Sequence, residues 1–309
     1  MNNRYNSINE FLKARFGERV FKVSLEIGSS CPNRDGAISR QGCSYCHPEA
    51  LRPSTYKDSD FSIISIQKQL EEGIDYIRRR HGSQKVIAYF QNGSNTYAPA
   101  QKLARAFTTA ASHPCVKGLA ISTRPDCIEQ EHLTLLKDLS RETFIWVELG
   151  LQSAHEETLK KINRGHTVRD FSKACSQHVK RGIPVCAHVI LGLPGETSEM
   201  MCETARFLNE IGVWGVKIHN LHVLKDTKME EEYRKGKIEI PSLDVYAGRV
   251  VDFLEELSPE ILIHRLNSHS PRHLTIAPKW SINKLATMNA VHDELERRDS
   301  WQGKRFCNP

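Results

Sequence analysis

Three cysteines near the start of the chain have a spacing that suits cluster chemistry. Cys31, Cys43 and Cys46 are separated by eleven and two residues, and Pro32 and Gly36 indicate that they share a loop. Structural zinc normally takes four protein ligands, and most iron–sulfur clusters take four cysteines. Three thiolates leave one iron of a cubane cluster open to an outside ligand. The loop therefore predicts an iron–sulfur centre that does chemistry rather than one that stores electrons.

Two other interpretations of these cysteines remain open from this segment alone. His47 follows Cys46 directly and could complete a zinc site with three cysteines and one histidine. Cysteine is also often a small buried residue that binds nothing. The second explanation is the weaker one, because three thiols on one turn-rich loop need a common reason.

The composition indicates a globular protein of the reducing cytosol. The 309 residues can bury a large core, and 39% of them are hydrophobic. No run of 18 apolar residues is present and the polar N-terminus lacks a signal-peptide pattern, so we expect a cytoplasmic protein without a membrane partner. Nine cysteines in a chain of this length form no disulfide framework, which favours thiolates that bind a cluster.

Positive charge is concentrated near the C-terminus. The formal net charge of +6 is a mild sign of a polyanionic partner. Residues 261–292 hold four Lys or Arg, four His and no Asp or Glu. An ordinary basic surface that closes the fold would have the same composition. If this segment binds substrate instead, the candidate residues are Arg265, Arg272, His273, Lys279, Trp280 and Lys284.

Strand-like and helix-like segments alternate along most of the chain. The alternation predicts an α/β fold with parallel strands and crossover helices, namely a partial (β/α)6 TIM-like barrel. In such barrels the chemistry takes place in the loops at the carboxyl ends of the strands. Apolar, β-rich runs predict strands at 20–27, 85–91, 117–122, 143–151, 184–191 and 215–223. Helical spacing predicts helices at 61–80, 99–112, 128–139, 155–162, 168–181 and 197–211.

The alternation changes after residue 226. A helix at 243–257, a strand at 261–266 and a helix at 281–298 predict a C-terminal α/β extension that covers the barrel. We therefore expect four parts, which are an N-terminal segment (1–19), the barrel (20–226), the extension (227–298) and a polar, mobile tail (299–309).

Polar residues occur at the ends of the predicted strands, where a barrel binds its ligands. Glu148 could instead pair with a barrel arginine, Arg164 could lie on a helix surface, and His188 could be a satisfied core residue. Their common position at one end of the barrel favours ligand binding. The candidates are Gln91, Asn92 and Gly93 after the second strand, Ser122 and Thr123 at the end of the third, Glu148 and Gln152 in and after the fourth, Arg164 beyond it, and His188 in the fifth.

Four motifs together resemble the radical S-adenosylmethionine (SAM) superfamily. The last three are similar to the branch of oxygen-independent coproporphyrinogen oxidase and the catalytic subunit of Elongator, and most similar to the latter. Within that branch the chain looks like a bacterial radical SAM protein of this length. The motifs are the three-cysteine loop, Ser-Thr-Arg-Pro-Asp at 122–126, Val-Glu-Leu-Gly-Leu-Gln-Ser at 147–153 with Asn-Arg-Gly-His at 163–166, and Val-Ile-Leu-Gly-Leu-Pro-Gly-Glu-Thr at 189–197.

The resemblance implies cofactors and roles. It implies a [4Fe–4S] cluster on Cys31, Cys43 and Cys46, with SAM on the fourth iron. Reductive cleavage of SAM would give a 5′-deoxyadenosyl radical that abstracts hydrogen from a substrate, and the electron would come from a donor such as flavodoxin or ferredoxin. The implied SAM contacts are Arg164 for the carboxylate, Gln152, Ser122 and Thr123 for the ribose, and Gln91, Asn92 and Gly93 near the methionine, with Glu148 and His188 as further candidates.

Three hypotheses remain for the function and the substrate. The likeness to Elongator and the basic C-terminal segment favour transfer RNA, with a wobble-uridine side chain as the target. The same cations could bind a small anionic metabolite, such as a tetrapyrrole. The alternative from another class is a zinc-dependent nucleic-acid-binding protein without catalysis.

Overall fold

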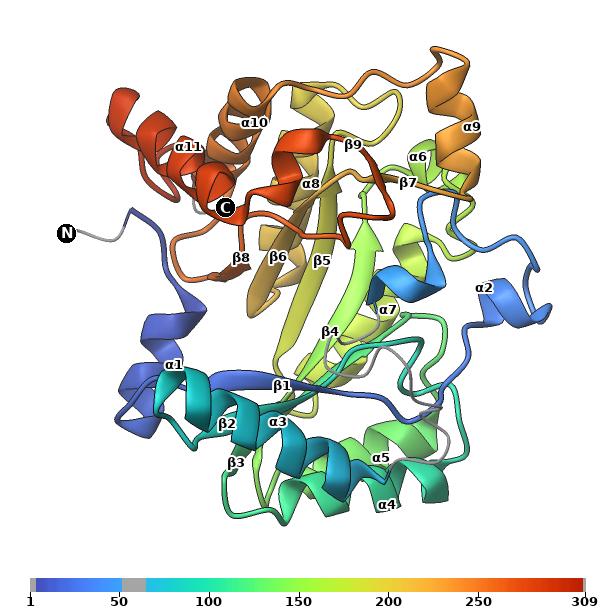
Figure 1. Ribbon diagram of the computed structural model, residues 1–309, viewed down its shortest axis with the longest axis vertical. Coiled ribbons are helices and arrows are strands. Elements are labelled where there is room, and N and C mark those ends of the chain that lie inside the picture. Colours follow the sequence, from blue (N-terminus) through green and yellow to red (C-terminus); the bar gives the residue numbers. More distant parts are fainter. Residues whose placement is uncertain (1–3, 52–64, 308–309) are drawn as a thin grey trace.

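A curled parallel sheet forms the centre of the computed structural model, which describes residues 4–51 and 65–307. The seven strands are ordered β1-β2-β3-β4-β5-β6-β8, and every neighbouring pair is parallel. Figure 1 shows the sheet curling into part of a barrel, which confirms the predicted fold class. The strands are β1 (Phe21–Leu25), β2 (Val86–Phe90), β3 (Val116–Thr123), β4 (Phe144–Gln152), β5 (Val185–Leu191), β6 (Gly215–Asn220) and β8 (Leu262–Arg265).

Crossover helices cover the outer face of the sheet. Helix α3 packs on β1, α4 on β3, and α7 on β4 and β5. The helix predicted at 61–80 begins at Ile66, and residues 61–64 lie outside the described residues. The helices of this layer are α3 (Ile66–His81), α4 (Ala100–Ala111), α5 (Gln130–Leu139), α6 (Glu156–Lys161), α7 (Val168–Val179) and α8 (Ser198–Ile211).

Side-chain caps fix where two of these helices begin, and so where the loops before them end. The Thr167 hydroxyl accepts the Asp170 N–H at the start of α7, and the Thr197 hydroxyl accepts the Met200 N–H at the start of α8. Such caps satisfy backbone donors that the first helical turn leaves free. The loops before α7 and α8 thus have fixed ends close to the sheet.

A helix that the sequence analysis did not predict closes the amino end of the barrel. Helix α1 (Ile8–Phe16) places Phe11 edge-on to Trp214, with ring centroids 5.4 Å apart, and next to Phe144. Both aromatic residues lie where strands begin, and they belong to a second apolar cluster that also contains Trp146. The barrel is therefore plugged with apolar side chains at this end.

The C-terminal extension contributes a strand to the barrel. The strand predicted at 261–266 pairs with β6 as β8, so it is the seventh strand of the main sheet rather than part of a cover. The strand predicted at 215–223 is divided into β6 and β7 (Val223–Leu224), and β7 pairs antiparallel with β9 (Thr275–Ala277). The remaining elements are α9 (Lys228–Arg234), α10 (Leu243–Glu256), a 3-10 turn at Lys279–Ile282 and α11 (Lys284–Arg297), of which α10 packs on α8 and α11.

The described part of the C-terminal tail is anchored. Ser300 and Gln302 are buried, and the Gln302 amide donates to the Ile261 carbonyl at 2.8 Å. The Gln302 side-chain oxygen accepts the Asn6 N–H at 2.9 Å, so the tail also holds the segment before α1. The expectation of a mobile tail is therefore wrong here, because these polar side chains satisfy buried backbone groups. None of the described helices has the length and apolar character needed to cross a membrane.

Candidate active site

A cavity of about 460 Å³ is formed at the carboxyl ends of the strands. Its walls come from the loops after β1, β2, β3 and β4 and from the ends of β5, β6 and β8. This is the position at which barrels of this type bind ligands. The cavity brings together every predicted cluster and SAM residue, namely Cys31, Cys43, Cys46, Gln91, Asn92, Gly93, Ser122, Thr123, Glu148, Gln152, Arg164 and His188.

The three cysteines share one wall of the cavity. Cys43 is buried, Cys31 and Cys46 are half-buried, and all three are free thiols. The short helix α2 (Pro32–Asp35) follows Cys31 directly, and the Arg34 guanidinium donates to the Cys46 carbonyl at 2.9 Å. These contacts turn the intervening residues back, so that Cys31, Cys43 and Cys46 line the same cavity.

The spacing of the thiols does not match a zinc site. Thiolates around one tetrahedral zinc ion lie about 3.8 Å apart, since the Zn–S bond is about 2.3 Å. Among the described residues, the group of potential ligands whose atoms all lie within 4.8 Å of one another is Glu148, Cys186 and His264, and it includes none of the three loop cysteines. The three loop thiols are therefore not all within 4.8 Å of one another, which is farther apart than the ligands of one zinc ion.

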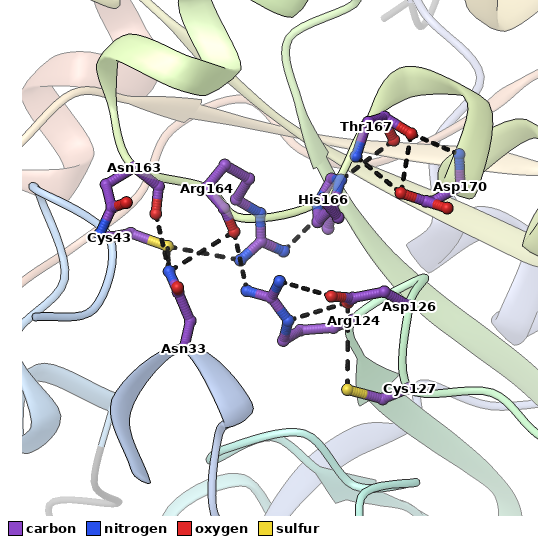
Figure 2. A network of polar contacts seen from close by, with 11 residues as sticks. Asn33, Cys43, Arg124, Asp126, Cys127, Asn163, Arg164, His166, Thr167 and Asp170 are labelled. Carbon is purple, nitrogen blue, oxygen red and sulfur yellow. Dashed lines mark hydrogen bonds and ion pairs between the residues drawn. The ribbon is translucent and has the colours of Figure 1, made fainter. Parts of the chain in front are cut away.

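Buried hydrogen-bond donors surround the Cys43 sulfur (Figure 2). Arg164 Nη1 lies 3.6 Å from the sulfur and Asn33 Nδ2 lies 3.5 Å from it. Burial alone would raise the pKa of the Cys43 thiol, but the positive charges of Arg164 and Arg124 outweigh burial and lower that pKa. At Cys46 the charges of Arg34 and Arg164 are outweighed, so burial and the neighbouring Cys43 raise its pKa to about 11. A thiolate is therefore more favourable at Cys43 than at Cys46.

Arg164 lies inside the site, so a helix-surface position is ruled out. Its side chain is buried, and Nη2 donates to the Gly150 carbonyl at 3.0 Å. A Cβ at Gly150 would come within 2.5 Å of the same nitrogen, so a larger residue here would displace the end of the Arg164 side chain. The Arg164 Nε is buried and makes no hydrogen bond with any described residue. A buried guanidinium with an unused donor is a ready ligand for an anionic group.

A second arginine supports Arg164 from below. Arg124 forms a two-point ion pair with Asp126, at 2.9 and 2.7 Å, and its Nη1 donates to the Arg164 carbonyl at 3.0 Å (Figure 2). His166 Nε2 lies 2.9 Å from the Gly150 carbonyl. Burial, together with the charges of Arg164 and Arg124, lowers the pKa of His166 to about 2, so this imidazole stays neutral. Arg124 thus holds the Arg164 backbone, and the neutral His166 shares the Gly150 carbonyl with the Arg164 guanidinium.

The backbone of Gly93 lies very close to another loop of the protein. A Cβ at this position would lie 2.4 Å from the Ser29 carbonyl oxygen, and φ is +72°. The neighbouring Ser94 N–H donates to the Ser30 carbonyl at 3.1 Å. The loop after β2 is therefore packed against the two residues that precede Cys31. Gln91, Asn92 and Gly93 line the cavity as parts of this packed pair of loops.

Glu148 is the centre of a buried ionic network on the barrel interior. It pairs with Lys22 at 3.3 Å and with Lys217, and it accepts a hydrogen bond from Trp146 Nε1 at 2.9 Å. Burial works against the carboxylate, but the two ammonium groups outweigh it and hold the pKa of Glu148 well below its usual range. The structural ion pair that the sequence analysis considered for Glu148 is thus present, with two lysines in place of an arginine. His188 Nε2 lies 2.9 Å from the same carboxylate, and burial lowers the pKa of this histidine to about 4.

The predicted substrate residues separate into two groups. Arg265 lines the cavity, whereas Arg272, His273, Lys279 and Lys284 are exposed outside it. Trp280 stacks on Tyr246, with ring centroids 5.1 Å apart, and its indole N–H donates to the Pro241 carbonyl. Its ring is therefore used in packing. The cavity residues that the sequence analysis did not select include Arg34, Arg124, His219, Asn220, His222, Ser268, His269 and Ser270.

Comparison with known proteins identifies the family. A model of the radical SAM superfamily matches residues 26–208, and a model of the Radical SAM C-terminal domain matches residues 213–297. Protein YtqA of Bacillus subtilis (strain 168) is 41% identical over 306 residues, which cover 98% of this chain and 93% of YtqA. This chain belongs to the radical SAM superfamily.

Two further matches relate this radical SAM protein to Elongator, as its motifs predicted. A tRNA uridine(34) acetyltransferase of Methanocaldococcus infernus is 32% identical over 175 residues, which are 54% of this chain and 30% of that enzyme. The structure of the archaeal Methanocaldococcus infernus Elp3, with an N-terminal deletion, gives a TM-score of 0.68 at 17% identity. It is matched over 92% of this chain and 64% of the Elp3 chain, and this similarity shows a shared fold.

The cofactors follow from the family. A radical SAM protein uses a [4Fe–4S] cluster and SAM, as the motifs predicted. The cavity fits both groups, because three free thiols share one wall and the buried Arg164 beside them has an unused donor. The zinc-binding alternative is therefore wrong, in agreement with the wide spacing of the thiols.

Proposed function

We propose that this radical SAM enzyme modifies transfer RNA by removing hydrogen from a side chain of the wobble uridine. The similarity to the tRNA uridine(34) acetyltransferases carries this proposal. The chain spans about a third of the length of those enzymes, so the proposal concerns the radical step alone. The exposed cations of the 272–284 segment lie outside the cavity and offer contacts for phosphates of a bound RNA.

We assign the cluster to Cys31, Cys43 and Cys46, and the SAM carboxylate to Arg164. When bound, the cluster and SAM supply hydrogen-atom abstraction from the substrate. The protein supplies the side chains that hold the cluster and SAM in place. Arg164 and Asn33 donate to the Cys43 sulfur, which favours the thiolate that binds iron. The proposed contacts of the rest of SAM are Gln152, Ser122 and Thr123 for the ribose and the Gln91, Asn92 and Gly93 loop for the methionine, beside Glu148 and His188.

The barrel also protects the reaction. Helix α1 and the apolar cluster around Trp146 close its amino end, so ligands enter at the carboxyl ends of the strands. The Glu148 network fills the interior below the cavity with charges that are already paired. A closed interior excludes water, which prevents side reactions of reactive species. The electron is supplied by a donor such as flavodoxin or ferredoxin.

Mass analysis of tRNA nucleosides tests the proposed substrate. A strain without this gene should lose one modified wobble uridine and accumulate its precursor. The wild-type gene should restore the nucleoside, while the Cys43→Ala variant should not. An unaltered set of modified nucleosides in the deletion strain would refute the tRNA substrate and would favour the alternative, a small anionic metabolite such as a tetrapyrrole.

A further inference from the structure

The charged groups that line the cavity are unequally paired. Its described lining contains four arginines and one carboxylate, Glu148. Three of the arginines have partners within the protein, since Arg34 donates to the Cys46 carbonyl, Arg124 pairs with Asp126, and Arg164 donates to Cys43 and Gly150. Although the Arg265 backbone pairs with Lys217 in the sheet, its guanidinium makes no hydrogen bond or ion pair with any residue in 4–51 or 65–307.

The single carboxylate of the cavity lining is not available to form an ion pair with Arg265. Glu148 is fully buried and pairs with Lys217 and Lys22. The positive charge of Arg265 also reaches this interior, because it contributes to the lowered pKa of Lys217 and of His188 after the larger effects of burial and of nearer groups. The wall around β6 and β8 therefore holds more positive charge than the protein itself compensates.

Two histidines on this wall, His219 and His222, stay neutral beside Arg265. The exposed Lys284 is a further cation nearby, whose pKa is lowered by partial burial and by the charge of Arg265. His222 lies 2.9 Å from the Ser268 hydroxyl and 3.1 Å from the Ser270 hydroxyl, and burial lowers its pKa to about 4. Burial, His188 and Arg265 hold the pKa of His219 well below its usual value. The Nε2 atom of His219 is buried and has no hydrogen-bond partner among the described residues. A neutral ring with an unused nitrogen is suited to orient a ligand next to the charged Arg265.

The position of Arg265 separates it from the proposed cofactor residues. It ends β8, at one edge of the seven-stranded sheet, whereas the cysteine loop follows β1 at the other edge. Both edges contribute to the same cavity. The SAM carboxylate already has a proposed partner in Arg164, next to Cys43. Arg265 is thus available to a second ligand that enters from the β8 side.

We propose that Arg265 binds an anionic group of the substrate, a carboxylate or a phosphate, on the β6–β8 wall of the cavity. This inference rests on the proposal that the cavity is the catalytic site, but it does not depend on the substrate being RNA. Arginine pairs with both anions through a planar fork of donors, which fixes orientation as well as affinity. Holding the anion at the β8 edge places the rest of the substrate between Arg265 and the cysteine wall.

Calorimetric titration with two simple anions tests this assignment. Anaerobic protein that carries its cluster is saturated with SAM, without reductant, so that Arg164 is occupied. It is then titrated with inorganic phosphate in one series and with acetate in another. We expect one of the two anions to bind with a stoichiometry of one, and its identity distinguishes a phosphate from a carboxylate on the substrate.

Variants with a matched control decide the result. Arg265→Gln should weaken binding of that anion about tenfold to a hundredfold, whereas Arg265→Lys should retain part of the affinity. Arg169→Gln removes an exposed arginine of α7 outside the cavity and should leave affinity unchanged. Unchanged iron content and SAM affinity show that each variant is folded. The assignment is overturned if neither anion binds the wild type, if Arg265→Gln binds like the wild type, or if Arg169→Gln is equally impaired. An unaltered nucleoside set in the deletion strain would refute the RNA substrate alone.

Discussion

Arg164 Nη1 lies 3.6 Å from the Cys43 sulfur and thereby joins the loop after β4 to the loop after β1. The same guanidinium donates to the Gly150 carbonyl and keeps Nε unused within the described protein. One side chain thus stabilises a thiolate and offers a donor to the ligand beside it. Changes at Arg164 should therefore affect both the cluster and SAM, but to different extents.

The first prediction concerns the cluster ligands. Replacing Cys31, Cys43 or Cys46 by Ala should abolish cluster binding, because three thiolates are the minimum for three irons. Cys115→Ala changes a half-buried cysteine outside the cavity lining and should keep full iron content. Iron analysis and visible absorption of anaerobically purified protein provide the measurement. Full iron occupancy in Cys43→Ala would show that the cluster has other ligands.

The second prediction concerns SAM affinity. Arg164→Ala should weaken SAM binding about tenfold to a hundredfold, because a hydrogen bond to a charged group contributes roughly 1.5–3 kcal/mol. The cluster should persist, since the three thiols remain. Calorimetry on cluster-containing protein measures the affinity, and Arg169→Ala, an exposed arginine on α7, is the matched control. If Arg164→Ala binds SAM like the control, Arg164 does not contact the cofactor.

The third prediction concerns the ionic network of the interior. Glu148→Gln should destabilise the fold by about 3–5 kcal/mol, because it leaves Lys217 and Lys22 without their shared anion. Adding Lys217→Met should recover much of the loss by removing the deeply buried ammonium group. Denaturant unfolding of the wild type, both single variants and the double variant provides the complete cycle. Additive losses would mean that the two residues do not interact.

The fourth prediction is a pH dependence of stability from a histidine away from the cavity. His178 on α7 is fully buried, and burial lowers its pKa from 6.5 to about 4. Between these values the unfolded chain binds a proton that the folded chain does not. His178 therefore does not reduce the free energy of unfolding above pH 6.5. As the pH falls from 6.5 to 4, the reduction caused by His178 grows to about 3 kcal/mol.

Removing His178 should flatten this profile. We expect His178→Leu to lose less stability than the wild type between pH 7.5 and pH 5, as measured by thermal unfolding midpoints. His273→Leu removes an exposed histidine instead and is the matched control, which should retain the wild-type profile. Identical pH profiles for His178→Leu and the wild type would contradict the assignment to His178.

The fifth prediction concerns RNA binding outside the cavity. Changing Arg272, Lys279 and Lys284 together to Gln should weaken tRNA binding and reduce its salt dependence, because each lost phosphate contact releases about one counterion fewer. Cleavage of SAM without substrate should not change. The matched control changes the cations Arg78, Arg79 and Arg80 on α3 to Gln. If both triple variants bind tRNA equally, the 272–284 surface is not the RNA site.

The site was predictable from sequence where local signals and the sheet geometry act together. Parallel strands bring their carboxyl ends to one side, so polar residues after β1, β2, β3 and β4 had to meet. Arg124 was missed as a site residue, although its spacing of two from Asp126 allows the observed fork. His219 and Asn220 at the carboxyl end of β6 were missed because the predicted strand continued to residue 223, whereas Ser268 carried no local signal, because its place depends on the pairing of β8 with β6.

The fold was less predictable where distant segments meet. The seventh strand was expected as a strand, but nothing in residues 261–266 specifies its partner β6 across helix α10. Helix α1 was not predicted at all, and it is held by contacts with β8 and with the tail, more than 250 residues away. Such pairings depend on the complete set of tertiary contacts rather than on local propensity.

The contact between Gln302 and Asn6 bears on how the protein is made. The segment before helix α1 is bonded to Ile263 of β8 and to Gln302, which are synthesised more than 250 residues after it. Until those residues have been made, these contacts cannot hold α1 over the apolar cluster around Trp146. Such late, long-range contacts slow folding and leave apolar surface open to aggregation in the incomplete chain.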